Sequence, residues 1–244
     1  MEPGANLARL AAEHALRLTD RQLEQFETYY RLLVEWNEKM NLTAITEKDQ
    51  VYVKHFYDSL TLSFHYPADR VKTMADIGSG AGFPGIPLKI AYPHIRLTIV
   101  DSLKKRITFL EELCNALGFD DVECVHARAE DAGRMREHRD KYDLVAARAV
   151  ARLNVLAEFC LPFAAAGGVF AAMKGSGAAA ELAEAKYAIS ELGGSVMETH
   201  RFTLPGGEEA ERNIILIRKT KLTPQKYPRK AGIPLKLPLK GSAG

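Results

Sequence analysis

The sequence predicts an α/β protein whose mainly parallel, seven-stranded sheet ends in an antiparallel hairpin and is preceded by a helical cap. Three observations lead to this prediction. Apolar strand patterns alternate with helical patterns between residues 71 and 218, which is typical of a parallel sheet with helical crossovers. A glycine-rich turn directly follows the first strand pattern. The last two strand patterns have no helix between them, which indicates a hairpin.

Residues 1–70 contain helical patterns and no βαβ unit, which predicts an appended helical cap. Thr19 and Gln22 fit a capping box, in which the two side chains satisfy exposed backbone N–H groups at a helix start. Apolar residues then recur at helical spacing, namely Leu23, Phe26, Tyr30, Leu33 and Met40. Asn41 is expected to end this helix, and a second helical pattern stops before Pro67.

Residues 71–218 form the predicted α/β domain. Its first five strands are expected at 71–77, 97–100, 122–126, 142–146 and 169–173. The helices are expected from the glycine-rich turn to about residue 92, then at 104–117, from 153 to about 165, and from about 179 to 192. Because strands and helices alternate, these strands should be parallel and joined by right-handed crossovers.

The end of the sheet separates two classes of nucleotide-binding fold. The last two strands are expected at 195–204 and 212–218, joined by the loop Pro205-Gly206-Gly207. Dehydrogenase sheets of the Rossmann type usually end on a parallel strand, whereas class I methyltransferase sheets usually end on such a hairpin. The predicted fold is therefore the Rossmann-like fold of class I S-adenosylmethionine methyltransferases. A nicotinamide-dependent oxidoreductase is the disfavoured alternative.

The glycine-rich turn runs from Asp76 to Gly85 and reads DIGSGAGFPG. Glycines such as Gly78 and Gly80 let a backbone turn sharply and approach a ligand without a Cβ clash. The spacing is GxGxG and differs from the GxGxxG of dinucleotide sites. S-adenosylmethionine carries no pyrophosphate, so the following helix need not hold an anion. The turn therefore favours S-adenosylmethionine as cofactor, and a purely structural turn is the alternative.

Acidic residues follow the second and third strands. Asp101 ends the second strand and can accept hydrogen bonds from a ribose diol, or it can cap the next helix. After the third strand, a backbone N–H near Ala129 and the carboxylate of Glu130 can read the amino group of an adenine. A solvated charged loop is the alternative for this segment.

Basic residues follow the fourth and fifth strands. Arg148 comes directly after the fourth strand, at the edge where parallel strands face a ligand crevice. An arginine there can bind the cofactor carboxylate or a phosphate, and an ordinary surface ion pair is the alternative. Lys174-Gly175 is placed similarly after the fifth strand.

Composition predicts a cytoplasmic protein without a membrane segment. No apolar stretch approaches the length of a membrane span, no signal peptide is visible, and the three cysteines form no CxxC pair. Residues 218–244 hold eight of the 33 Lys and Arg and none of the Asp and Glu. We expect the proline-rich tail, residues 219–244, to be extended, to bind RNA and to leave the cofactor site untouched. A merely solvated tail, or one packed on the sheet, is the alternative.

Several motifs together resemble one bacterial family. The motifs are Trp36-Asn37, Asn41-Leu42-Thr43, His55-x-x-Asp58-Ser59-Leu60, the segment from Asp76 to Pro87, Asp101-Ser102, Arg148-Ala149-Val150, Lys174-Gly175, Tyr227-Pro228-Arg229 and Gly232-x-Pro234. In this order they are similar to the 16S ribosomal RNA guanine-N7 methyltransferase G family, formerly called glucose-inhibited division protein B. The resemblance spans almost the whole chain.

The resemblance implies an enzyme that methylates N7 of the guanosine usually numbered 527 in 16S rRNA, within the small ribosomal subunit. It also implies that the family's cofactor contacts fall on Gly78, Phe83, Ala129, Glu130 and Arg148. A substrate-side role is open for the cap motifs. His55 and Asp58 can equally hydrogen-bond each other, and Asn41 and Thr43 can close a helix end.

The chemistry of guanine N7 explains why no catalytic residue is named. N7 has a lone pair and no proton, so attack on a methyl sulfonium needs no general base, and positioning is the main task. No metal site is expected, and a monomer is expected. The alternatives are a methyltransferase of the same fold that acts on another RNA, a protein or a small molecule, and an RNA-binding protein with a vestigial pocket.

Overall fold

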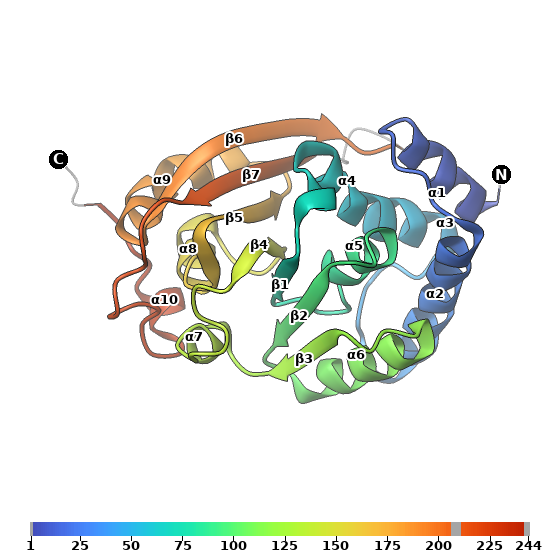
Figure 1. Ribbon diagram of the computed structural model, residues 1–244, viewed down its shortest axis with the longest axis horizontal. Coiled ribbons are helices and arrows are strands. Elements are labelled where there is room, and N and C mark those ends of the chain that lie inside the picture. The colour runs from blue at the N-terminus through green and yellow to red at the C-terminus, as the bar shows by residue number, and fades with distance from the viewer. Residues whose placement is uncertain (1, 206–210, 242–244) are drawn as a thin grey trace.

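A seven-stranded sheet with helices on both faces forms the centre of the computed structural model, which describes residues 2–205 and 211–241 (Figure 1). The strand order is β3-β2-β1-β4-β5-β7-β6, and β7 runs in the direction opposite to the other six of these strands. The strands are β1 (Thr73–Ile77), β2 (Arg96–Asp101), β3 (Val122–His126), β4 (Tyr142–Arg148), β5 (Ala164–Lys174), β6 (Gly194–Thr203) and β7 (Glu211–Lys219). The predicted fold class and terminal hairpin are confirmed; Gly206 and Gly207 of its loop lie outside the described residues.

The helices that alternate with these strands are α5 (Gly85–Ala91), α6 (Lys104–Leu117), α7 (Ala129–Ala132), α8 (Leu153–Cys160) and α9 (Ala178–Glu191). Three of them, α5, α6 and α9, begin and end close to where the sequence places them, whereas α8 ends early and α7 was not expected. Gly118 ends α6 in the left-handed conformation with a φ of 72°, which glycine adopts without a Cβ penalty.

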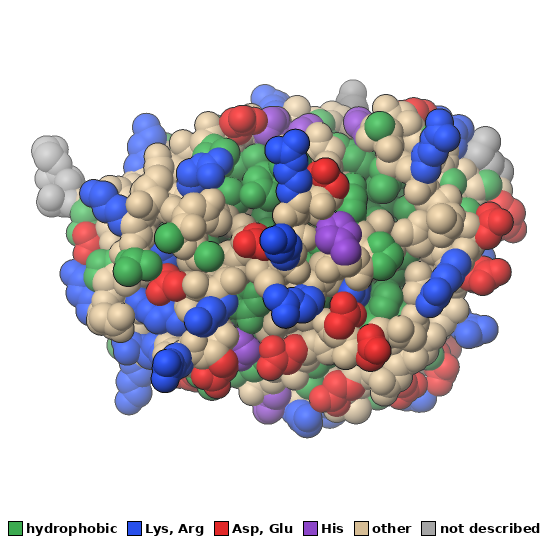
Figure 2. All heavy atoms as spheres, in the orientation of Figure 1, with side chains coloured by type: hydrophobic (Ala, Val, Ile, Leu, Met, Phe, Trp, Pro, Cys, Tyr) green, Lys and Arg blue, Asp and Glu red, His purple; other side chains and the backbone are tan. Residues whose placement is uncertain are grey.

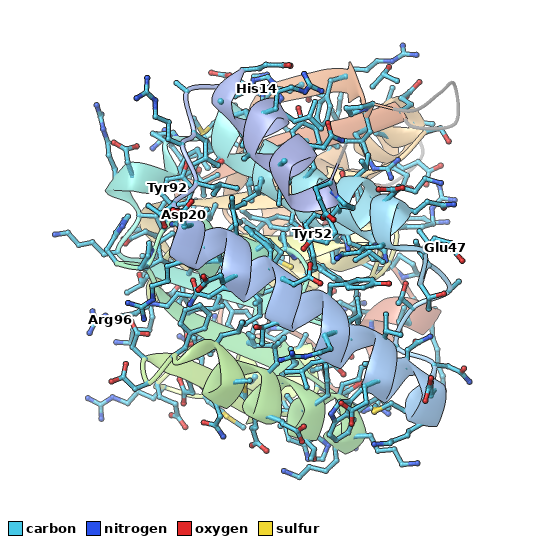
Figure 3. All side chains as sticks on the ribbon, turned by 90° about the vertical axis from the view of Figure 1, so that its right-hand side faces the viewer. His14, Asp20, Glu47, Tyr52, Tyr92 and Arg96 are labelled. Carbon is cyan, nitrogen blue, oxygen red and sulfur yellow. The ribbon has the colours of Figure 1, made fainter. Side chains whose placement is uncertain are left out.

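The first 70 residues are helical between short connections. They comprise α1 (Pro3–Ala12), α2 (Asp20–Met40), α3 (Lys48–Val51), the π-helix η1 (Tyr52–Tyr57), α4 (Asp58–His65) and the short 3₁₀ helix η2 (Ala68–Arg70). Thr19 and Gln22 form the expected capping box at the start of α2, and Asn41 ends that helix in the left-handed conformation. Figure 3 looks onto this cap and shows α2 lying beside α6.

The sheet separates two apolar cores. On one face, α2, η1, α5 and α6 pack together, with Phe26, Phe56 and Phe109 fully buried. On the other face, α8 and α9 pack against alternate residues of the same strands. Side chains alternate between the two faces of a strand; for example, Leu144 belongs to the first core and Val145 to the second.

The boundary between α8 and β5 differs from the expected one. The helix was expected to continue to about residue 165, but it ends at Cys160, and β5 already begins at Ala164. Pro162 accounts for this end, because proline lacks the backbone N–H that the helix would need there. Lys219 Nζ at the end of β7 then donates to the carbonyl oxygens of Leu161 and Ala164, at 2.6 and 3.3 Å, and lies 2.9 Å from Asp140 Oδ1. The buried lysine therefore binds carbonyl groups that the ended helix leaves without a partner.

The C-terminal segment after β7 folds back onto the body. Tyr227 is buried, and Arg229 binds both carboxylate oxygens of the fully buried Glu158 on α8. The expectation of a wholly extended tail is wrong at α10 (Ile233–Lys236), where Pro234 lies in the first turn, the one helical position that tolerates proline well. The cap and this tail lie at opposite ends of the molecule (Figure 1).

No helix in the described parts of the chain is both long and apolar enough to cross a membrane.

We expect Arg229→Ala to lower stability by about 2–3 kcal/mol, because it leaves the Glu158 carboxylate buried without its cation. For a chain of this size that corresponds to a fall in Tm of about 4–12 °C. Arg152→Ala is the matched control, since it breaks an exposed arginine–glutamate pair with Glu184 and should cost less than about 1 kcal/mol. Equal shifts in the two thermal melts would show that the tail is not anchored by Arg229.

Candidate active site

A cavity of about 280 Å³ lies where the first four strands end. Ligands bind at the carboxyl ends of strands in open α/β sheets because the strands and their loops converge there. The lining residues come from these loops and from the tail: Ile77, Gly78, Val100, Asp101, Ser102, Arg106, Ala127, Arg128, Ala129, Glu130, Ala149, Val150, Phe159 and Leu235. We call it the strand-end cavity.

Asp76 fixes the glycine-rich turn from below. Its Oδ2 accepts hydrogen bonds from Ser79 Oγ at 2.5 Å and from Gly85 N–H at 2.8 Å. Burial raises the pKa of this carboxyl group to about 6. Its Oδ1 is buried and has no hydrogen-bond partner among the described residues. An unsatisfied buried acceptor is costly, so this turn is suited to a ligand that brings a donor.

The cap also holds this turn. Tyr29 of α2 is fully buried and donates a hydrogen bond to the carbonyl oxygen of Ala81 at 2.5 Å. A Cβ at Gly82 would lie 2.6 Å from the Tyr29 hydroxyl, so only glycine permits this contact. The helical pattern in the sequence included Tyr30, which is partly buried and packs against the core, but not Tyr29, which is fully buried.

Gly80 lies at the open side of the turn. Its φ is 63°, and a Cβ built there would have no protein atom within 4 Å. Its N–H donates to Asp101 Oδ2 at 3.0 Å. A side chain at this position would therefore point into the space in front of the turn.

Asp101 ends β2 as expected and is buried at the strand-end cavity. Besides Gly80, it accepts a hydrogen bond from Leu103 N–H at 2.9 Å and lies 3.5 Å from an Arg106 guanidinium nitrogen. A carboxylate offers about four lone-pair sites. Asp101 thus orders the loop before α6 and still borders the cavity.

Ala129 and Glu130 lie in the first turn of α7, where a loop was expected. Glu130 is buried, and its Oε1 accepts a hydrogen bond from Gly232 N–H of the tail at 2.8 Å. Leu235 of α10 also lines the cavity. The tail therefore reaches the strand-end cavity, which contradicts the expectation that it leaves this region untouched.

A second cavity, of about 350 Å³, lies between the cap and the ends of β4, β5 and β7. Its lining residues are Ile45, Lys54, His55, Asp58, Arg148, Ala149, Met173, Lys174, Gly175, Glu181 and Arg212. We call it the cap–sheet cavity. Ala149 lines both cavities, so the two are neighbours across this one residue.

Arg148 points to the cap–sheet cavity and does not line the other one. Its guanidinium group lies 2.9 Å from Asp58 Oδ2 and 4.8 Å from the centre of the Phe83 ring. Arg212 of β7 donates to the other oxygen of Asp58 at 3.1 Å. The side chain of Asp58 is only 3% exposed, so it forms a buried ion pair between the cap and the sheet. The alternative considered for Arg148, an ordinary ion pair at the surface, is therefore wrong. Asp58 therefore binds the two arginines and not His55, which the sequence had offered as one alternative partner.

His55 is an uncharged ring in the wall of this cavity. Burial and the nearby Arg148 cation lower its pKa to about 4, so it is neutral at physiological pH. Its ring stacks on Phe83 at 4.7 Å, and its Nε2 shares a hydrogen bond with Thr43 Oγ1 at 2.8 Å. Phe83 itself is buried behind these groups and lines neither cavity.

Of the seven residues that the sequence singled out, the structure brings four together on the strand-end cavity: Gly78, Asp101, Ala129 and Glu130. Gly80 borders it through Asp101, whereas Phe83 and Arg148 lie toward the cap–sheet cavity. Sequence reasoning missed Arg212 and Leu235. A basic residue at the start of the apolar strand β7 was the available signal for Arg212. Nothing local marked Leu235.

Comparisons with known proteins agree with one another. The family model of rRNA small subunit methyltransferase G matches residues 22–215. The chain is 59% identical to ribosomal RNA small subunit methyltransferase G of Bacillus velezensis, over 94% of this chain and 96% of that one. It is 57% identical to the protein of the same name from Brevibacillus brevis, over 95% and 97%.

Solved structures show the same fold at low identity. A putative O-methyltransferase from Klebsiella pneumoniae matches with a TM-score of 0.55 and 12% identity, covering 80% of this chain and 90% of that one. Cofactor-bound Rv0187 from MTB matches with a TM-score of 0.56 and 17% identity, covering 79% and 90%.

We expect Gly80→Ala to weaken S-adenosylmethionine binding at least tenfold, because the added methyl group enters the space in front of the turn. Gly118→Ala is the matched control: its φ is 72°, and its Cβ also meets no atom within 4 Å, but it lies at the end of α6. Both variants carry the same backbone strain, so both should lose similar stability. Titration calorimetry that found the same affinity in the two variants would refute this placement of the cofactor.

Proposed function

The chain belongs to the rRNA small subunit methyltransferase G family, and we infer that it transfers a methyl group from S-adenosylmethionine to ribosomal RNA. We propose that the acceptor is N7 of the guanosine usually numbered 527 in the 16S rRNA of the small subunit. The observation that carries this proposal is the near full-length similarity to proteins named for that activity. The two adjoining cavities support it, because group transfer needs a donor and an acceptor side by side.

The strand-end cavity fits the proposed cofactor. We assign the ribose diol to Asp101, the adenine to Ala129 and Glu130, and the close approach of the backbone to Gly78 and Gly80. The unpartnered Oδ1 of Asp76 supplies an acceptor for a cationic group beside the same turn. When bound, the cofactor supplies an electrophilic methyl group on a positively charged sulfur. Phe83 and Arg148, also proposed as contacts, lie at the boundary with the cap–sheet cavity.

The chain's own residues need to orient the reactants and nothing more. Guanine N7 carries a lone pair and no proton, so no side chain has to act as a base first. His55 is neutral, and the Asp58 carboxylate is already bound by both Arg148 and Arg212, so neither group is free to act as a base. We therefore assign no general base, and positioning supplies the rate enhancement.

The RNA must present an accessible guanine. N7 faces the deep major groove of A-form RNA, which side chains cannot enter, so the target has to lie in a loop, a bulge or an opened helix. On the side of the molecule where α7, α9 and α10 lie, most charged side chains in view are Lys and Arg (Figure 2). Such a surface suits phosphate contacts. We propose that the protein acts as a monomer, since residues of a single chain line both cavities. We also propose that it acts in the cytoplasm, where ribosomal RNA is found.

We expect the protein to transfer labelled methyl groups to 16S rRNA or to small-subunit particles. Borohydride reduction followed by aniline cleavage, which breaks RNA at N7-methylguanosine, should give one new cleavage site. A protein or a small molecule as the labelled product, or a methyl group on another atom or another RNA, would instead favour a methyltransferase of the same fold with a different substrate.

We expect Arg148→Ala to lower kcat/KM at least tenfold while the protein stays folded. The change removes a charge-assisted contact beside the reacting groups, which is worth about 1.5–3 kcal/mol. Arg152→Ala, four residues further along, is the control because its side chain is exposed and pairs only with Glu184 among the described residues. Activity of Arg148→Ala within twofold of this control would assign Arg148 to structure alone.

A further inference from the structure

The cap–sheet cavity lies where a methyl acceptor has to lie. It opens at the carboxyl ends of β4 and β5 and meets the strand-end cavity at Ala149. Ala149 has a φ of 57°, in the left-handed region that non-glycine residues rarely adopt. Such strain persists where the surrounding structure fixes it, and it is common at ligand sites. This backbone turn is the narrow wall between the two cavities.

The charges of the cavity wall fit a nucleotide. The cations are Lys54, Arg148, Lys174 and Arg212, and the carboxylates are Asp58 and Glu181. Both carboxylates are already paired with cations of the same wall: Asp58 with the two arginines, and Glu181 with Lys174 at 2.8 Å. The wall therefore carries two positive charges in excess. A phosphate group of the RNA chain is the anion that such a wall attracts.

The rest of the wall suits a flat base. Ile45, Met173 and the methyl group of Ala149 are apolar, and the His55 ring is uncharged. With about 350 Å³, the cavity falls at the small end of ligand pockets. Enzymes that modify a nucleobase take it out of the stack into such a pocket.

We propose that the cap–sheet cavity receives the target guanine of the RNA, flipped out of its stack, and that the guanidinium groups held by Asp58 read its O6. This inference rests on the proposed function. Guanine carries the acceptor O6 beside N7, where adenine carries an amino donor, so the fixed N–H donors of Arg148 and Arg212 favour guanine. Asp58 acts as a positioning residue, because each of its oxygens fixes one arginine.

The transfer itself needs no further group. The N7 lone pair forms the new bond to the methyl carbon as the carbon–sulfur bond breaks. The positive charge moves from sulfur to the purine, S-adenosylhomocysteine leaves neutral at sulfur, and no proton is exchanged.

Filling the cavity tests its assignment. Gly175 lines the cap–sheet cavity but not the strand-end cavity, its φ lies outside the left-handed region, and a Cβ there meets no atom within 4 Å. We expect Gly175→Leu to lower methyl transfer at least a hundredfold while Tm and affinity for S-adenosylmethionine stay unchanged. Gly175→Ala, which fills less space, should lose less. A Gly175→Leu protein that methylates at the wild-type rate would overturn the assignment.

Base discrimination tests the role of the arginines. The rate of methyl transfer is measured on rRNA with guanine or adenine at the target position. We expect Arg212→Ala to reduce the guanine-to-adenine ratio of kcat/KM at least tenfold. Arg201→Ala on the neighbouring strand β6 is the control, since Arg201 is exposed and pairs with Glu211; it should leave the ratio as it is. An unchanged ratio in Arg212→Ala contradicts the reading of O6.

The wild-type protein separates the two proposals. If it does not modify N7 of a guanine, the proposed function fails, whatever the variants do. If it does, and Gly175→Leu remains fully active, only the cavity assignment fails.

Discussion

One buried carboxylate joins the helical cap to the sheet, and the wall of the cap–sheet cavity depends on it. Asp58 comes from α4, while its partners Arg148 and Arg212 come from the ends of β4 and the start of β7. A carboxylate taken out of water is stable only when its oxygens are paired. The two arginines meet that need, and in doing so they are fixed in the wall of the cap–sheet cavity. Together with the hydrogen bond from Tyr29 to Ala81, this ion pair holds the cap against the ends of the strands.

The cap and the tail thus shape the site from opposite ends. The cap supplies Tyr29, which holds the glycine-rich turn, and Asp58, which fixes the arginines. The tail supplies Gly232 and Leu235, which close the strand-end cavity over Glu130. The basic tail is therefore part of the proposed cofactor site. Its buried members cannot contact phosphate: Lys219 lies fully inside, and Arg229 is bound to Glu158.

Local patterns in the sequence were enough to predict the sheet, most helix ends and the strand-end acid Asp101. These features depend on neighbours within a few residues: a capping box, a left-handed Gly118, an apolar run. The direction of Arg148 could not be predicted, because its partner Asp58 lies 90 residues away. The early end of α8 was missed for a different reason, because the apolar pattern was followed past Pro162, which is a local signal for the end of a helix. The composition of the tail showed that it is basic. The sequence around Glu158 did not show that this residue is buried and binds Arg229 of the tail.

The central claim is that the two neighbouring cavities hold donor and acceptor across Ala149. A crystal structure of the protein with S-adenosylhomocysteine and a short RNA that contains the target guanine tests this claim most directly. We expect the cofactor sulfur in the strand-end cavity and the flipped guanine in the cap–sheet cavity. Guanine N7 should face the cofactor sulfur, with room between the two atoms for the methyl group that is transferred. Guanine O6 should lie within hydrogen-bond distance of Arg148 or Arg212. A guanine bound outside the cap–sheet cavity, with that cavity filled only by water, would contradict the account.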